Sequence, residues 1–218
     1  MCFSAPASFV TAGITGVIGV VALTRVKRPR EVPFAATPLL FAVQQCIEGL
    51  LWLNLPQAPD GFLSASSTVL YLFFAEAFWP LYAPIVVWLI EPNATRRHLM
   101  VVCLGVGAGV GAYLLWWILD NPPFAMISGG HIVYVTESGH SDAVGAAYLA
   151  ATALPLLLSS RRSVVVLGAI VLTGLVVAYA LYWQSLTSVW CFFAAAASVA
   201  ILSHFEWSRR SREPIANA

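Results

Sequence analysis

The chain has 218 residues, of which 60% are hydrophobic and only 10% are charged, and its formal net charge is +1. Together with a mean hydropathy of +0.82, this composition excludes an ordinary soluble globular domain and indicates a membrane protein with several spans. The length leaves room for seven spans and short loops but for no sizeable soluble domain.

Seven apolar segments follow one another, most of them near the roughly 20 residues that a helix needs to cross a bilayer. They cover residues 5–24, 32–54, 66–90, 99–119, 143–158, 164–184 and 189–207. We therefore predict an all-α fold, a single transmembrane bundle of seven helices, with a short tail over 208–218. The first segment has neither a basic start nor a clear cleavage site, so we expect a retained helix rather than a signal peptide.

The basic residues predict how this bundle is oriented. All of them fall in the first, third and fifth connections or in the tail: Arg25, Lys27, Arg28, Arg30, Arg96, Arg97, Arg161, Arg162, Arg209, Arg210 and Arg212. The positive-inside rule assigns that side to the cytoplasm, so the N-terminus is outside and the C-terminus inside. We expect a multi-pass protein of the inner (plasma) membrane, with the lipid bilayer and not nucleic acid as its partner.

The second span carries a polar face. Gln44, Gln45, Glu48 and Trp52 are spaced so that they share one side of a helix. Glu48 is expected near the outer end of the span, and the two glutamines one turn deeper. This face therefore points a carboxyl and two amides into the outer half of the bundle.

The third span contains the acid that lies deepest in the predicted membrane. Glu76 lies near the middle of an apolar run, where an ionisable side chain is costly and by default indicates a functional site. Pro80 lacks the N–H that would bond the carbonyl of Glu76, and Pro84 repeats the defect one turn later, so we predict a kink beside the acid. Glu76 is level with the two glutamines of the second span, and we expect one polar cluster. Hydrogen bonds between helices that only stabilise the packing are the alternative.

The fourth span contains two overlapping GxxxG pairs, Gly105 with Gly109 and Gly107 with Gly111, which close helix packing explains without any chemistry.

The loop from 120 to 142 follows this span. In it, the β-branched and aromatic run over 132–136 lies between glycine-containing turns. This pattern predicts an extended segment or hairpin over the outer mouth of the bundle, in the position of a lid.

The outer side has no Lys or Arg and carries Asp60, Asp120, Glu137 and Asp142, so we expect it to attract cations. His131, Glu137 and His140 are candidate ligands in the outer loop. Their spacing matches no zinc signature, and we predict no bound metal or cofactor.

The last two spans add aromatic residues to the outer third of the bundle, among them Tyr179 and Trp183. Packing and interfacial anchoring explain each aromatic residue singly, but the inner halves of the spans have few polar side chains. We therefore predict a polar cavity that opens outward and closes before the cytoplasm. Cys2 and Cys191 both fall near the outer side, where a disulfide is one option, and buried free thiols are expected for Cys46 and Cys103.

Three stretches carry a resemblance to a known family. They are the opening MCFSA followed by ASF, the QQ and EG of the second span, and the WCFF of the seventh. With these motifs the chain resembles an uncharacterised family of small bacterial membrane proteins, a domain of unknown function. The resemblance covers nearly the whole chain and implies no activity.

The leading functional hypothesis is a membrane protein that binds or senses a small ligand, a cation or a proton from outside. Glu76 is its central acid, Glu48 the partner, Gln44 and Gln45 the orienting amides, and the kink at Pro80 the element that switches. Two acids close together in a low dielectric should not both stay ionised. The alternatives are an intramembrane enzyme acting on a lipid with one of these acids as general acid or base, a small-solute transporter, and a scaffold.

Overall fold

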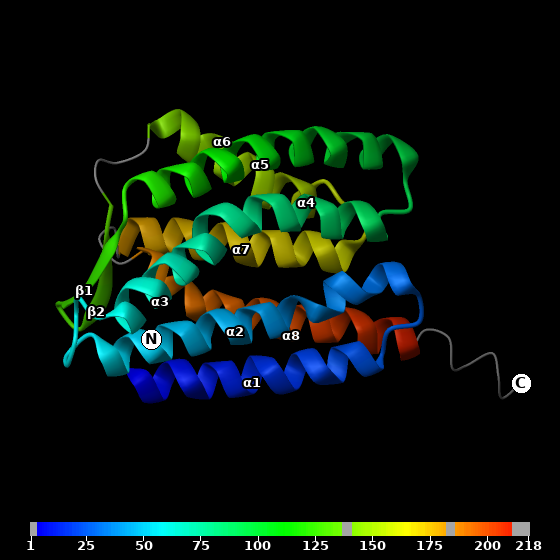
Figure 1. Cartoon of the computed structure of the whole chain (residues 1–218). Coiled ribbons are helices and arrows are strands. Elements are labelled where there is room, and N and C mark those ends of the chain that lie inside the picture. The colour runs from blue at the N-terminus through cyan, green and yellow to red at the C-terminus, as the bar shows by residue number, and fades with distance from the viewer. Residues whose placement is uncertain (1–3, 137–140, 182–185, 211–218) are drawn as a thin grey trace, which may run out of the picture.

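The protein is mostly helical and forms a bundle of antiparallel helices closed at one end by a β-hairpin (Figure 1). The computed structural model describes residues 4–136, 141–181 and 186–210. Its long helices are α1 (Ala5–Thr24), α2 (Val32–Asn54), α5 (Ala94–Asp120), α6 (Asp142–Leu157), α7 (Arg162–Leu181) and α8 (Leu186–Arg210). Between α2 and α5, the segments α3 (Phe62–Leu72), η2 (Phe73–Phe78) and α4 (Trp79–Ile90) form one further rod.

Four of these helices are long and apolar enough to cross a membrane: Ala5–Thr24, Pro29–Asn54, Phe62–Ile90 and Ala94–Asp120. The side of α1 that faces away from the bundle is apolar. Val10, Ile14, Val17 and Val20 recur at helical spacing and are all more than half exposed, which suits a lipid environment and not water.

Local sequence signals explain where the helices begin. Ser4 caps α1 by accepting a hydrogen bond from the N–H of Ala7 (3.4 Å), and Asn93 caps α5 by accepting one from the N–H of Arg96 (3.0 Å). Because of the Asn93 cap, α5 begins at Ala94 and not near residue 99. The third rod likewise begins at Phe62 and not near residue 66, since Gly61 already has the extended conformation of a cap residue.

The predicted hairpin is present. Strands β1 (Phe124–Ser128) and β2 (His131–Val135) pair in antiparallel register, with Ser128 opposite His131. The two-residue turn between them is Gly129–Gly130, and both residues have positive φ (59° and 78°), as a tight primed turn requires. An all-α description therefore omits this small sheet.

The hairpin packs against the last turns of α2 and against α3. Ile132 is fully buried in an apolar cluster with Ile47, Leu51 and Leu55. Nearby, the ring of Tyr134 stacks on that of Tyr71, with centroids 4.8 Å apart and an interplanar angle of 2°. The hairpin is thus a fixed cover over this end of the bundle.

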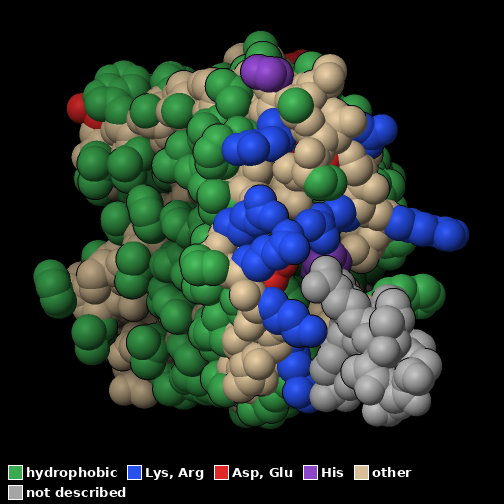
Figure 2. Space-filling view, turned by 90° about the vertical axis from the view of Figure 1, so that its right-hand side faces the viewer, with side chains coloured by type: hydrophobic (Ala, Val, Ile, Leu, Met, Phe, Trp, Pro, Cys, Tyr) green, Lys and Arg blue, Asp and Glu red, His purple; other side chains and the backbone are tan. Residues whose placement is uncertain are grey.

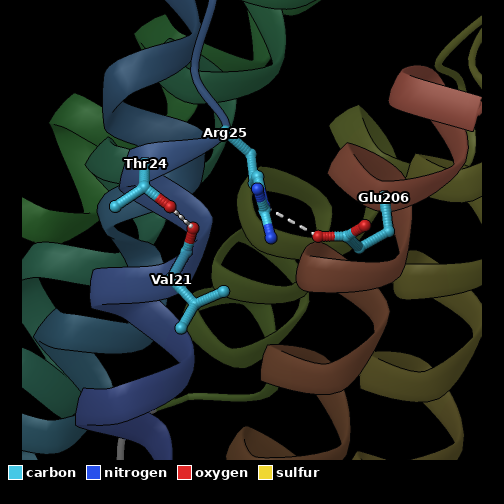
Figure 3. Close-up of polar contacts among 4 residues, drawn as sticks. All are labelled: Val21, Thr24, Arg25 and Glu206. Atoms are coloured by element: carbon cyan, nitrogen blue, oxygen red, sulfur yellow. Dashed lines mark hydrogen bonds and ion pairs between the residues drawn. The ribbon is translucent and has the colours of Figure 1, made fainter. Parts of the chain in front are cut away.

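The opposite end of the bundle carries the basic residues. The connections between α1 and α2, α4 and α5, and α6 and α7 all lie there, and Figure 2 shows their Lys and Arg side chains gathered on one face. Figure 3 shows the ion pair that links α1 to α8 at this end, from Arg25 Nε to Glu206 Oε1 at 2.8 Å. The described Lys and Arg residues are thus gathered at this end, and Asp60, Asp120 and Asp142 lie near the hairpin end.

Candidate functional site

A cavity of about 310 Å³ lies within the bundle and is lined by residues of α2, η2, α4, α5, α6, α7 and α8. Its volume is at the lower end of the range found for small-molecule sites. Most of the lining is aliphatic or aromatic. The polar side chains that line it are Thr37, Gln44, Glu76, Trp79, Tyr82, Tyr148 and Thr152.

Glu76 reaches this cavity from an irregular stretch of the third rod. Residues Phe73–Phe78 form a π-helix, which continues directly into α4 at Trp79. A π-helical turn inserts one extra residue per turn and often marks a functional position. Glu76 is half-buried there and lines the cavity, whereas the next residue, Ala77, is buried.

The π-helical register changes which carbonyl lacks its helical partner. In the i+5 register of a π-helix, the N–H opposite the carbonyl of Ala75 would be that of residue 80, which is proline and has none. The sequence predicted this gap at Glu76, because an α-helical i+4 register was assumed. The hydroxyl of Tyr148 on α6 donates a 2.6 Å hydrogen bond to the Ala75 carbonyl.

We expect Tyr148→Phe to lower the stability of the bundle by about 1 to 3 kcal/mol, because it leaves the part-buried Ala75 carbonyl without this donor. The thermal unfolding midpoint of the purified protein in detergent measures this loss. Thr152→Val is a suitable comparison on the same cavity wall, since the Thr152 hydroxyl donates only to backbone carbonyls of its own helix. Equal midpoints for Tyr148→Phe and wild type would contradict the assigned role of this hydrogen bond.

Two glycines of α5 allow the helix to approach the same irregular backbone. A Cβ atom at Gly107 would lie 1.9 Å from the carbonyl oxygen of Pro80, and one at Gly111 would lie 2.7 Å from that of Ala77. Gly105 and Gly109, the other predicted pair, have no atom within 4 Å of such a Cβ. Only one of the two GxxxG pairs is therefore a packing contact, and it faces the wall that carries Glu76.

Gln44 is held in place by an aromatic neighbour. Its Oε1 accepts a 3.0 Å hydrogen bond from the indole Nε1 of Trp79, and both side chains are buried and line the cavity. The Trp79 ring also packs on Phe41, with centroids 4.7 Å apart. The indole of Trp79 thus orients the amide of Gln44 beside the cavity.

Glu48 and Gln45 do not belong to this cavity. Both are almost completely buried on α2, but neither is among the lining residues. Of the two predicted acids, Glu76 is thus the one among the described lining residues.

The cavity also extends further toward the basic end than the sequence indicated. Its lining includes Phe34 in the first turn of α2, Val87 in the last turn of α4 and Leu156 in the last turn of α6. The only polar side chains of the described lining at that end are Thr37 and Tyr82, and the Tyr82 hydroxyl donates to the Pro33 carbonyl at 2.6 Å. The cavity therefore has an apolar extension toward the basic end of the bundle.

The remaining candidate residues lie elsewhere. His131 is on β2 beside the hairpin turn, where burial lowers the pKa of its imidazole. Glu137, His140 and Trp183 lie outside the described residues, as does the side chain of Tyr179 on α7. Among the residues that the structure describes, no three His, Cys, Asp or Glu side chains are grouped closely enough to hold a metal ion.

Sequence reasoning missed a buried carboxylate at the basic end. Glu91 follows α4 directly and is only 2% exposed. Its Oε2 accepts hydrogen bonds from the hydroxyl of Ser159 and the N–H of Ser160, both at 2.8 Å, and its Oε1 accepts from the Ser160 hydroxyl and from the N–H of Asn93 (3.1 Å). The sequence placed Glu91 at a helix end, where an acid needs no explanation, so only its neighbours from the α6–α7 connection reveal the cluster.

Several donors determine the charge state of Glu91. Burial alone would raise the pKa of this carboxyl, but the hydrogen bonds from Ser160, Asn93 and Ser159 together hold its pKa below the ordinary value of 4.5. The carboxylate is therefore ionised at neutral pH. It joins the end of α4 to the start of α7, directly beneath the part of the cavity lined by Val87 and Leu156.

A second polar pair at this end lies between α7 and α8. Ser163 and His204 are hydrogen-bonded through Oγ and Nδ1, and the His204 ring meets Phe34 edge-on, with centroids 5.3 Å apart. Neither Ser163 nor His204 lines the cavity. The pair connects the ends of the two helices that close the bundle.

These features define a helical protein with membrane-spanning character and a largely apolar cavity that presents a carboxyl group. The family model described as "Family of unknown function (DUF6629)" matches residues 1–218, and the chain belongs to this family. This confirms the expected membership of a family of unknown function. Comparison with curated proteins and with solved structures finds no match.

Proposed function

We propose that the protein is an integral membrane protein that binds a small molecule in the cavity beside Glu76. The cavity itself carries this proposal, because an internal space of about 310 Å³ with few polar groups on an apolar wall is the usual form of a small-molecule site. Two acids were expected to share the site. The proposal now rests on Glu76 alone, with Gln44 and Trp79 as its polar neighbours.

Seven spans with the N-terminus outside form part of the proposal. The described basic side chains gather at one end of the bundle and the acids Asp60, Asp120 and Asp142 lie toward the other, which supports this orientation in an inner membrane. A reporter that is active only in the cytoplasm, fused after Ala218, should be active. A silent reporter on a stably accumulated fusion would contradict the orientation.

Binding is favoured over catalysis by the composition of the lining. Its described residues include no Ser, Cys, Lys or His that would serve as nucleophile or base. The hydroxyls of Thr37 and Thr152 donate to backbone carbonyls of their own helices. A ligand in the cavity would therefore contact Glu76, and the described lining places no nucleophile beside this carboxyl group.

A cavity-filling substitution tests whether small molecules bind here. We expect Ala83→Leu on α4 and Ala153→Leu on α6 to keep the protein folded, because the added methyl groups enter empty space, and to abolish binding of small apolar probes. Ala112→Leu is the matched control, since Ala112 is exposed on α5. The readout is the rise of the unfolding midpoint with 4-phenylbutylamine, 4-phenylbutan-1-ol or 4-phenylbutanoate in nanodiscs. If none of the three shifts wild type more than Ala83→Leu, the proposal fails.

Transport is the second candidate, favoured by the length of the cavity. Its lining reaches from Val144 and Gly145, in the first turn of α6, to the first turn of α2 at the other end of the bundle. A site that occupies much of the helix length requires only modest helix movements to open on either side. Counterflow of a bound probe in proteoliposomes distinguishes the two candidates, because a receptor binds without exchanging the probe across the membrane.

A further inference from the structure

We infer that the ligand of this cavity is a small lipophilic amine, which binds as a cation with its ammonium group at Glu76 and its apolar body toward the basic end of the bundle. This inference rests on the proposed function and specifies its ligand class. Four features of the cavity lead to it.

The first feature concerns the hydrogen-bond donors of the cavity lining, most of which already bond to acceptors within the protein. The indole N–H of Trp79 donates to Gln44, and the hydroxyls of Tyr148 and Tyr82 donate to the carbonyls of Ala75 and Pro33. The Thr152 hydroxyl donates to a carbonyl of its own helix. These hydroxyl and indole donors are committed to the protein, and the Gln44 amide, whose Oε1 accepts from Trp79, adds an NH2 donor to the same wall. Glu76 supplies a carboxylate that accepts several hydrogen bonds, so a ligand group that donates hydrogen bonds is best matched at Glu76.

The second feature is charge. Glu76 is the one carboxyl of the described lining, and that lining contains no Lys, Arg or His. An anionic ligand would place a second negative charge beside Glu76 in a low dielectric, while a cationic ligand supplies the opposite charge that stabilises a carboxylate there. The faces of Trp79, Tyr82 and Tyr148 also attract cations. Fatty acids and other carboxylates are thereby disfavoured.

The third feature is the composition and size of the apolar part of the cavity. From Glu76 toward the basic end the lining is dominated by Phe34, Val86, Val87, Leu156, Leu167 and Ile201. This wall suits a hydrocarbon or aromatic body. A volume of about 310 Å³ is that of a compact ligand and not of a lipid with two acyl chains.

The fourth feature is the surface charge at the hairpin end. Asp60, Asp120 and Asp142 are exposed acids near that end, and Asp142 begins the helix whose first turn lines the cavity. Surface charge of one sign raises the local concentration of oppositely charged ligands and speeds their association. The external field and the internal carboxyl therefore select the same ligand charge.

The test compares three probes with one carbon skeleton: 4-phenylbutylamine, 4-phenylbutan-1-ol and 4-phenylbutanoate. Equilibrium binding is measured at pH 7.5 on the full chain in nanodiscs, with empty nanodiscs as the partitioning control. We expect wild type to bind the amine about tenfold or more tightly than the alcohol, as a charge-assisted hydrogen bond implies, and the carboxylate most weakly. In Glu76→Gln the preference for the amine should disappear while the alcohol still binds.

The outcomes separate this inference from the proposed function. If wild type binds the alcohol as tightly as the amine, or if Glu76→Gln keeps the preference, the amine assignment is wrong although the cavity is a binding site. The comparison of probes on wild type decides this even if Glu76→Gln fails to fold. If no probe binds wild type better than Ala83→Leu, the cavity is not a binding site and both proposals fall.

Discussion

Gly107→Ala is expected to lower the unfolding midpoint sharply or to prevent accumulation of folded protein. The new Cβ would lie 1.9 Å from the Pro80 carbonyl oxygen, a backbone atom that cannot rotate away. Helix α5 must then move off α4, at a cost we place near the upper end of the range for overpacked cores, about 3 kcal/mol. The displacement also disturbs the π-helical wall that presents Glu76. The unfolding midpoint and the yield of monodisperse protein in detergent measure the effect.

The matched control is on the same helix, two residues further along. A Cβ added at Gly109 would have no atom within 4 Å, so Gly109→Ala should keep or slightly raise the midpoint through its better helix propensity. Equal behaviour of the two variants would show that α5 does not approach α4 as closely as described. It would also remove the support that this contact gives to the cavity wall.

Glu91→Ala is expected to destabilise the basic end of the bundle by about 3 kcal/mol. The substitution removes the acceptor of two hydroxyls and two N–H groups in a site where the carboxylate is 2% exposed, and leaves several of these donors unsatisfied. The end of α4 and the start of α7 then lose the hydrogen bonds that join them. Thermal unfolding in detergent at pH 7.5 measures the change. Glu206→Ala is the control, because the partly exposed Arg25–Glu206 pair should contribute less than about 1 kcal/mol.

The stability that Glu91 contributes should depend on pH with a definite sign. The pKa of this carboxyl in the folded protein lies below 4.5, so its contribution is present above about pH 4.5 and is lost as the pH falls through the lower, folded-state pKa. The wild-type midpoint should therefore fall more steeply than that of Glu91→Gln as the pH is lowered below about 4.5. Parallel curves for the two proteins would contradict the ionised, hydrogen-bonded state of Glu91.

The candidate site was only partly predictable, as Glu76 and Gln44 show. Depth along a helix follows from counting residues, so the sequence placed these two side chains at one level, and both line the cavity. Counting does not say what occupies the bundle at each level. Glu48 was therefore grouped with them, although it is not among the residues that line the cavity.

The sequence by itself determined the features that depend on local pattern and composition. Long apolar runs made the helices, the Gly129–Gly130 pair made the hairpin turn, and the basic connections defined one end of the bundle. Each follows from a property of neighbouring residues: the length of an apolar run, a required positive φ, or a local excess of charge.

Only the tertiary structure decided which groups meet. The Tyr148 hydroxyl reaches the Ala75 carbonyl 73 residues away, and Ser159 reaches Glu91 across 68 residues. The choice of Gly107 rather than Gly109 as the contact with α4 depends in the same way on how α5 is rotated. Such contacts are set by helix rotation and by the π-helical shift in register, which no local periodicity encodes, and they determine the shape of the cavity that Glu76 faces.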